Sequence, residues 1–464
     1  MQPPAHPLFV ALALCAGAAP ALAGEAEKGP RPDTTPTLKW AAPIGKTTYR
    51  STIHVQRDRI IVNSNGADYK SKQDEWDGVY LLNAKDGQLI RRIVPPGKGE
   101  KDCNGVALDG DHLIFGTDQG SIYKVTDTGK VLWRAFLKGD IEAAPVLAEL
   151  NGDGILDVAI GAEEGHFYGL NGKNGKKLFT LRTAKGDYGQ RGFVATAAAR
   201  DFNGDGRAEL FVPGRDGVMR ALDGKSGKPL WQKGGESGRH GAPVIVDTNG
   251  DGRYEVIFTA SYSMVTVADA QTGRVLWETE LKNPRGGIEG LFAPVGWLPA
   301  EQCALIASAW WKRAEGVSCV GPRGVRWRYT EQKENITSGV VIADVDGSPG
   351  DEIVFGTESG KVVAIDTDGG IVWTYDTGGP VECAPTIADI DADGLNEVLV
   401  AVNDNIFYIA SVTKEDLEEV QNERIGLLHV LDTQGKGPPL LGYYRGSPRN
   451  DGFLFAAERQ AQRR

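Results

Sequence analysis

The sequence predicts an all-β fold: a single eight-bladed β-propeller of four-stranded blades, with the ring closed by an N-terminal strand. Two repeated patterns predict it. An acidic, glycine-rich loop recurs five times, and a Gly-x-x-Tyr…Asp-x-x-x-Gly-x-x-x-Trp pattern recurs between the loops. A unit of about 45 residues with four short strands cannot bury both of its faces alone, so we expect the units to pack radially.

The acidic loop is clearest from Asp201 to Glu209, which reads Asp-Phe-Asn-Gly-Asp-Gly-Arg-Ala-Glu. Oxygen-bearing side chains at positions 1, 3, 5 and 9 and a glycine at position 6 are the pattern of a calcium-binding loop. The predicted metal ligands of the five copies are Glu149, Asn151, Asp153, Asp157, Asp201, Asn203, Asp205, Glu209, Asp247, Asn249, Asp251, Glu255, Asp344, Asp346, Ser348, Glu352, Asp389, Asp391, Asp393 and Glu397. The alternative is a plain hairpin turn with solvated acids, but such a turn needs no acid at position 9.

The spacing of the loops gives the number of units. The loops begin at residues 149, 201, 247, 344 and 389, so the third interval is about twice the others and one internal unit lacks its loop. Each loop is expected to form the tip of a hairpin between two strands. The first strands of the eight units are expected to begin near Ser51, Cys103, Ala143, Ala195, Gly241, Phe292, Ser338 and Cys383.

The N-terminal strand follows from the position of one tryptophan. Trp40 stands 11 residues before Ser51, just as Trp327 stands 11 residues before Ser338. Residues 38–40 are therefore expected to form an outer strand that completes the eighth unit.

The chain begins like an exported protein. Residues 8–23 are apolar and end in Ala-x-Ala before a charged stretch, which predicts a signal peptide over residues 1–23. This run is too short to span a membrane, so we expect a periplasmic or secreted protein. The remaining divisions are a flexible segment (24–35), the propeller (36–456) and a disordered tail (457–464).

The charge balance argues against nucleic acid as a partner. The net charge is −11, from 51 basic and 62 acidic residues, and sixteen of the acids stand at loop ligand positions. The acidity thus belongs to the predicted metal sites, and the chain offers no broad basic face. We expect a monomer.

Four cysteines remain after residues 1–23. Cys303 and Cys319 are expected to form a disulfide between neighbouring strands of the unit that lacks a loop. Cys103 and Cys383 begin the inner strands of units two and eight, too far apart for a disulfide. They are either small buried side chains or a soft-metal or redox site near His240.

The repeats also carry a family likeness. The loops resemble the FG-GAP and VCBS-type repeats of integrin-type propellers. The second pattern resembles the PQQ-like repeat of the quinoprotein alcohol dehydrogenase-like superfamily, which includes an outer-membrane assembly lipoprotein. Residues 444–452 (Tyr-Arg-Gly-Ser-Pro-Arg-Asn-Asp-Gly) resemble a segment common in PQQ-like proteins. The resemblance implies the fold and leaves the function open, because propellers host many activities.

Three functions stay open. The first, which we favour, is a non-catalytic binding or scaffold module for a protein or a glycan, with calcium as its cofactor. The second is a polysaccharide lyase or glycosidase at one mouth of the axial channel. The third is a PQQ-dependent dehydrogenase, but PQQ is not expected because the chain lacks adjacent cysteines and a Cys-x-x-Cys-His motif. The candidate residues of the channel mouth are Asp102, Cys103, Glu142, Arg191, Arg239, His240, Arg285, Glu289, Glu382 and Cys383.

One observation separates these functions. An exposed apolar patch would favour binding of a protein, whereas a deep cleft with converging titratable groups would favour an enzyme.

Overall fold

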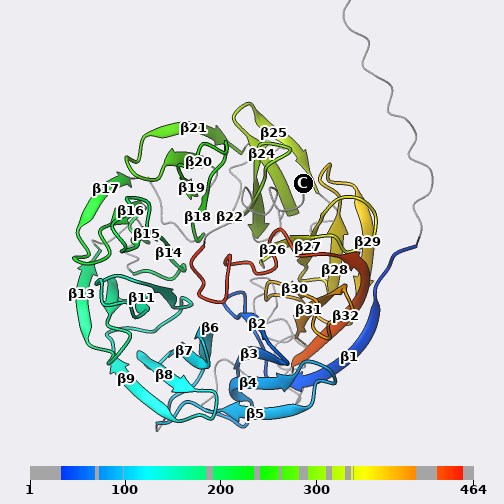
Figure 1. Cartoon of the computed structure of the whole chain (residues 1–464), viewed down its shortest axis with the longest axis horizontal. Coiled ribbons are helices and arrows are strands. Elements are labelled where there is room, and N and C mark those ends of the chain that lie inside the picture. The colour runs from blue at the N-terminus through cyan, green and yellow to red at the C-terminus, as the bar shows by residue number, and fades with distance from the viewer. Residues whose placement is uncertain are drawn as a thin grey trace, which may run out of the picture. The chain divides into compact units, whose positions relative to one another are not determined.

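The predicted propeller is confirmed by a computed structural model. The structure describes residues 33–67, 73–97, 99–183, 192–234, 241–260, 264–281, 291–309, 316–329, 336–337, 339–403 and 426–452. In these ranges the chain forms eight antiparallel sheets of four strands arranged as a ring, with no helix (Figure 1). Residues 34–464 form one compact unit. The predicted signal peptide and the predicted tail lie outside the described residues.

Blades 1 to 4 follow one another along the chain, and the strands of each run in order from the axis outwards. Blade 1 holds β2 (Ile53–Gln56), β3 (Arg59–Asn65), β4 (Asp77–Asn83) and β5 (Leu89–Ile93). Blade 2 holds β6 (Cys103–Asp109), β7 (His112–Thr117), β8 (Ser121–Thr126) and β9 (Val131–Phe136). Blade 3 holds β10 (Val146–Ala148), β11 (Asp157–Ala162), β12 (His166–Leu170) and β13 (Lys177–Arg182). Blade 4 holds β14 (Ala198–Arg200), β15 (Glu209–Pro213), β16 (Val218–Leu222) and β17 (Pro229–Gly234).

Blades 5 to 8 complete the ring. Blade 5 holds β18 (Val244–Val246), β19 (Glu255–Ala260), β20 (Met264–Asp269) and β21 (Val275–Glu280). Blade 6 holds β22 (Leu291–Leu298), β23 (Cys303–Ala309), β24 (Gly316–Gly321) and β25 (Gly324–Arg328). Blade 7 holds β26 (Val340–Ala343), β27 (Glu352–Gly356), β28 (Lys361–Ile365) and β29 (Ile371–Asp376). Blade 8 holds β30 (Thr386–Ala388), β31 (Leu395–Val402), β32 (Gly426–Lys436) and β1 (Thr37–Ile44).

The N-terminal strand closes the ring as predicted. β1 pairs antiparallel with β32 and forms the outer strand of blade 8, so one sheet joins the two ends of the propeller. The predicted loops also lie where expected, between the first and second strands of blades 3, 4, 5, 7 and 8. In blade 6 only residues 299–302 join β22 to β23.

The Gly…Trp pattern is explained by packing between neighbouring blades. Trp133, on the outer strand of blade 2, donates its indole N–H to the carbonyl oxygen of Gly172 in blade 3, at 2.9 Å. Gly175 of the same turn has φ +70°, and a Cβ there would lie 2.7 Å from the Trp133 ring. A side chain at this position would collide with the ring. The same packing of an aromatic ring against a turn glycine joins Trp40 to Gly87, Phe179 to Gly227, Trp231 to Gly273 and Trp327 to Gly369.

The predicted disulfide in blade 6 is confirmed. Cys303 on β23 and Cys319 on β24 are bonded, with their Cα atoms 5.5 Å apart. Both lie in a buried cluster formed by blades 5, 6 and 7. This covalent link is in the blade that has no acidic loop.

The C-terminal segment, residues 437–452, fills the centre of the ring (Figure 1). Its carbonyl oxygens accept hydrogen bonds from backbone N–H groups of six inner strands, in blades 2, 3, 4, 5, 7 and 8. These bonds join Leu108 to Pro448, Leu147 to Arg449, Ala199 to Asp451, Ile245 to Gly452, Ile342 to Leu441 and Ile387 to Gly442. The inner edges of these strands face the axis, and the segment supplies the acceptors that their backbone groups need.

Candidate functional site

The five acidic loops share a buried acid at position 9. This acid lies in the second strand of its blade, and its carboxylate accepts a hydrogen bond from the backbone N–H of loop position 2. The five acids with their donors are Asp157 with Leu150, Glu209 with Phe202, Glu255 with Thr248, Glu352 with Val345, and Glu397 with Ile390. Each position 9 acid is therefore fixed below the loop.

The acid at position 1 folds the loop over this buried group. Its carboxylate accepts from the backbone N–H of position 4, for example from Gly204 to Asp201 at 2.7 Å and from Gly347 to Asp344 at 2.8 Å. In blade 7 the carboxylates of Asp344, Asp346 and Glu352 come within 4.8 Å of one another. Blade 8 brings Asp389, Asp391 and Glu397 together in the same way.

The residues present fit a hard cation. Burial raises the pKa of Asp157 to about 6 and the pKa values of Glu209, Glu352 and Glu397 to about 7, and neighbouring loop carboxylates add to each shift. In blade 3 one oxygen of Glu149 is buried and has no hydrogen-bond partner among the described residues. Carboxylate and amide oxygens are the kind of ligand that calcium prefers.

The loop of blade 8 already contains a positive charge from the protein. The Lys39 ammonium, on β1, lies 2.6 Å from a carboxylate oxygen of Asp391, 2.8 Å from Asp432 and 3.5 Å from Glu397. Burial alone would lower the pKa of Lys39, but its hydrogen bonds to Asp391 and Asp432 and the charge of Glu397 raise it above the ordinary value. Lys39 thus ties the closing strand to the acidic loop, a role that the sequence interpretation missed.

The channel mouth contains a buried carboxyl group between blades 1 and 2. Asp102 is buried beside Asp118, has φ +54°, and its backbone N–H donates to Asp77 at 2.9 Å. Burial raises the pKa of Asp102 to about 8, and the charge of Asp118 contributes. A non-glycine residue in this backbone conformation is strained, and such strain is often found at functional positions.

Both carboxyl groups of the mouth have a basic partner, and that of Asp102 is the Lys101 ammonium at 2.9 Å. Glu142 forms an ion pair with Arg50, which the sequence interpretation did not include. Burial raises the pKa of Glu142 to about 7, although Arg50 opposes the shift. Glu382 is buried as well. Both Glu142 and Asp102 can therefore change protonation near neutral pH.

The two remaining cysteines are free and fully buried. Burial raises the pKa of the thiols of Cys103 and Cys383 far above the usual range, and the Cys383 thiol donates to the carbonyl oxygen of Ser51 at 3.3 Å. This geometry matches the first of the two interpretations, small buried side chains. The other predicted mouth residues, Arg191, Arg239, His240, Arg285 and Glu289, lie outside the described residues.

The described residues at the axis line two spaces, a hollow of about 340 Å³ between β2, β6 and residues 447–451 and a smaller cavity. A cavity of about 20 Å³ lies between the inner part of blade 1, the start of β30 and the C-terminal segment. The residues that line it are Tyr49, Arg50, Ser51, Thr52, Ile53, His54, Ala384, Pro385, Thr386, Tyr443, Tyr444, Arg445 and Asn450. Among the described residues no helix is long and apolar enough to span a bilayer.

A comparison with protein families places most of the chain in one of them. A family model described as outer membrane protein assembly factor BamB matches residues 75–289 and 313–418. The curated BamB of Burkholderia pseudomallei (strain K96243) is 26% identical over 236 residues, which cover 49% of this chain and 55% of that protein. The BamB of Nitrosomonas eutropha is 26% identical over 172 residues, or 38% of its length. The matches thus span about half or less of these relatives.

Solved structures share the fold at low identity. BamB from Moraxella catarrhalis is 18% identical, with a TM-score of 0.53, and the match covers 86% of this chain and 97% of that one. The quinohemoprotein alcohol dehydrogenase ADHIIG from Pseudomonas putida HK5 is 15% identical, with a TM-score of 0.60, and the match covers 87% and 77%. The predicted PQQ-like propeller is confirmed by these matches, while the metal loops stay a prediction.

Proposed function

Because the chain belongs to the outer membrane protein assembly factor BamB family, we propose that it is an exported, non-catalytic propeller that binds a protein partner during outer membrane protein assembly. The apolar run at residues 8–23 supports export to the periplasm. A protein is favoured over a glycan as the partner, because the relatives are named as assembly factors.

The observation that carries this proposal is a concentration of exposed apolar side chains on three neighbouring blades. Seven of the ten large apolar side chains exposed in the described residues lie on or next to the outer strands of blades 8, 1 and 2, which follow one another around the ring (Figure 1). We call them the apolar rim: Leu38, Leu89, Ile90, Val94, Val131, Leu132 and Phe136. Phe136 is 68% exposed. Concentrated apolar exposure of this kind marks protein interaction surfaces.

The spaces at the axis favour a non-catalytic role. Small-molecule and cofactor sites have volumes of about 300 to 1,000 Å³; the hollow at the axis, about 340 Å³, reaches only the lower end of that range, and the second space is a cavity of about 20 Å³. The near-neutral carboxyl groups Asp102 and Glu142 do not line that cavity. Among the described residues, these observations favour a binding role over a lyase, a glycosidase or a PQQ-dependent dehydrogenase.

We also propose that calcium stabilises the propeller through its acidic loops. The support is the convergence of the carboxylates at positions 1, 3 and 9 in the loops of blades 7 and 8. The loop of blade 8 should bind calcium least well, because the Lys39 ammonium already contacts Asp391 and Glu397. Calcium would act as a structural ion that joins the first two strands of each of these blades.

Complementation of a deletion strain tests the proposed function. We expect loss of the gene to lower the amounts of folded outer membrane proteins, and expect the wild-type chain to restore them. A rim variant, Ile90→Glu with Phe136→Glu, should fail to restore them, because two carboxylates would have to be buried against the partner. The matched control is Leu230→Glu with Ile371→Glu, which changes exposed apolar residues of blades 4 and 7. Full activity of the rim variant, or equal loss in the control, would contradict the proposal.

A further inference from the structure

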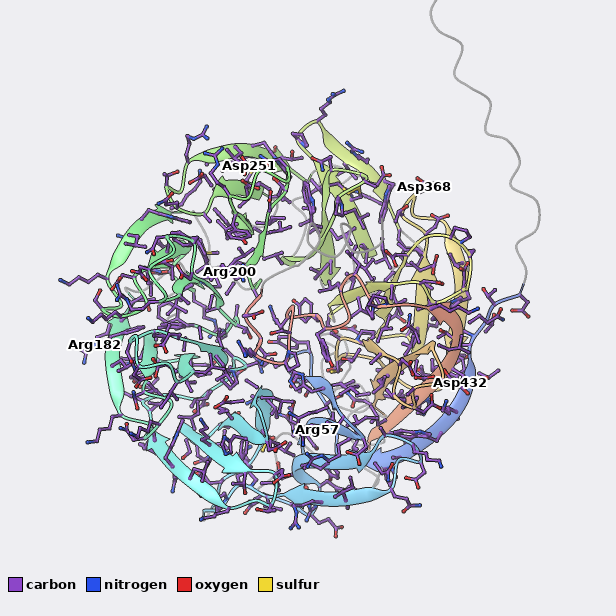
Figure 2. All side chains as sticks on the ribbon, in the orientation of Figure 1. Arg57, Arg182, Arg200, Asp251, Asp368 and Asp432 are labelled. Atoms are coloured by element: carbon purple, nitrogen blue, oxygen red, sulfur yellow. A yellow bond between two sulfur atoms is a disulfide. The ribbon has the colours of Figure 1, made fainter. Side chains whose placement is uncertain are left out.

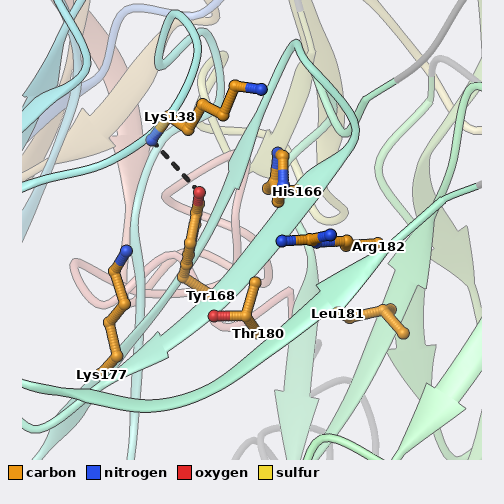
Figure 3. Close-up of a pocket in the computed structure, with 7 residues that line it drawn as sticks. All are labelled: Lys138, His166, Tyr168, Lys177, Thr180, Leu181 and Arg182. Atoms are coloured by element: carbon orange, nitrogen blue, oxygen red, sulfur yellow. Dashed lines mark hydrogen bonds between the residues drawn. The ribbon is translucent and has the colours of Figure 1, made fainter.

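A hollow with a volume of about 640 Å³ lies against the outer half of blade 3 (Figure 3). Its lining residues are Lys138, His166, Tyr168, Lys177, Thr180, Leu181 and Arg182. None of these residues belongs to the apolar rim, to an acidic loop or to the lining of the axial cavity.

The register of two strands places its polar groups together. β12 and β13 pair so that His166 lies opposite Arg182 and Tyr168 lies opposite Thr180. Side chains two residues apart on a strand point to the same face, so these four side chains share one face of the sheet. Lys138 comes from the connection after β9, and its backbone N–H donates to the Tyr168 hydroxyl at 3.2 Å.

The tyrosine ring organises the cationic groups. The His166 ring stacks on Tyr168, with centroids 5.8 Å apart and planes 15° apart. The Lys177 ammonium lies 4.8 Å from the centroid of the same ring. Tyr168 is itself buried, so its ring is a fixed support for both groups.

Positive charge in the hollow exceeds the negative charge near it. Lys138, Lys177 and Arg182 contribute three cations, and Glu164 forms an ion pair with Lys138 at 3.3 Å. Both side chains of that pair are more than half exposed, so the pair holds Lys138 weakly. Lys177 and Arg182 form no ion pair with another residue in the described part of the chain.

His166 adds an independent observation. Its side chain is 8% exposed, and its Nδ1 atom is buried with no hydrogen-bond partner among the described residues. Burial lowers the pKa of His166, and the charges of Arg182, Lys138 and Lys177 lower it further. The lowered pKa of His166 therefore reflects, in part, the positive potential that the three cations create.

We propose that this hollow binds a phosphate monoester group carried on a small organic body. A guanidinium and two ammonium groups offer the charge-assisted donors that phosphate oxygens accept, and arginine can bind two of those oxygens at once. The volume exceeds what phosphate alone requires and falls in the range of small-molecule sites. The group could belong to a soluble sugar phosphate or to a lipid headgroup. This site goes beyond the proposed protein-binding role and does not depend on it.

Binding is tested on the purified full-length protein with glucose 6-phosphate, and with glucose as the uncharged control. We expect glucose 6-phosphate to bind and glucose not to bind in calorimetry. Arg182→Gln or Lys177→Gln should each weaken binding about fivefold to tenfold, through loss of a charge-assisted contact. Lys173→Gln, an exposed residue of the turn between β12 and β13, is the matched control and should change the affinity less than twofold.

The histidine gives a second readout in the same protein. Bound phosphate offsets the three cations, so the pKa of His166, followed by NMR of its ring protons and assigned with His166→Gln, should rise on saturation. Vesicles of phosphatidylcholine with and without phosphatidic acid identify the source of the phosphate. Binding only to vesicles with phosphatidic acid supports a lipid headgroup, and binding of glucose 6-phosphate alone supports a soluble ligand. The proposal is overturned if neither probe binds, if the pKa of His166 does not move, or if Lys173→Gln weakens binding as much as Arg182→Gln.

Discussion

Replacing Lys39 by methionine should change the calcium response of the propeller. In the wild-type chain the Lys39 ammonium contacts Asp391, Asp432 and the buried Glu397. Removing one partner of a buried ion pair costs about 3 to 5 kcal/mol. Because Asp432 is 42% exposed and Lys39 itself is partly exposed, we expect a smaller cost of about 2 kcal/mol for Lys39→Met without calcium.

Calcium should reverse this loss. At a hundredfold excess over Kd, an ion that binds only the native state adds about 2.7 kcal/mol per site. With an unfolding entropy of about 2.1 cal/mol/K per residue, a chain of this size gains roughly 1 °C in Tm for each kcal/mol. The methionine variant opens the blade 8 loop to the ion, so its calcium-induced rise in Tm should exceed that of the wild type by about 3 °C.

The assay is thermal unfolding by circular dichroism in EGTA and in excess calcium, with Lys130→Met, an exposed lysine on a turn, as the control. Calorimetric titration should also find one more calcium site in Lys39→Met than in the wild type. Equal calcium-induced shifts in both proteins would refute the role given to Lys39. No shift in either protein would refute the calcium loops as a whole.

Three further predictions concern buried polar groups. Asn450→Ala should destabilise the protein by about 2 kcal/mol in urea unfolding, because the buried Asn450 amide donates to two backbone carbonyl oxygens of blades 2 and 3. An unchanged urea midpoint would contradict the role of the C-terminal segment at the axis. The pKa of Glu142 is raised to about 7 in the folded state, so its contribution to stability is complete below about pH 4.5 and is lost as the pH rises through 7. Glu142→Gln should therefore gain stability relative to the wild type between pH 5 and pH 8, by on the order of 3 kcal/mol, and a pH-independent difference would count against this. Cys103 and Cys383 should react with a thiol reagent only after denaturation, because both are buried; rapid reaction of the native protein would show that the channel mouth is open.

The fold could be predicted from the sequence because its determinants are local and repeated. The glycine turn and the outer-strand tryptophan recur in several units, so each copy supports the interpretation of the others. The closing strand could also be predicted, because Trp40 stands as far before the first strand of the next unit as Trp327 does. Residues 37–44 form that strand.

The missed features all join residues that are far apart in the sequence. The C-terminal segment is held mainly by backbone hydrogen bonds, such as the one from Leu147 to Arg449, and backbone groups leave no pattern in the side chains. The pairs of Arg50 with Glu142 and of Lys39 with Asp391 depend on blade packing. Lys39 lies at an irregularity in the pairing of β1 with β32, between Leu38 and Trp40, and no pattern in the sequence indicates that irregularity.

Crosslinking in living cells tests the protein-binding role most directly. A photoreactive phenylalanine derivative would replace Phe136 on the apolar rim, and in a second strain it would replace Ile371 on blade 7. After irradiation, the adducts are purified and identified by mass spectrometry. We expect the derivative at position 136 to crosslink to an outer membrane protein or to another assembly factor, and the derivative at position 371 to do so far less. Absence of such an adduct at Phe136, or equal yields at the two positions, would contradict it.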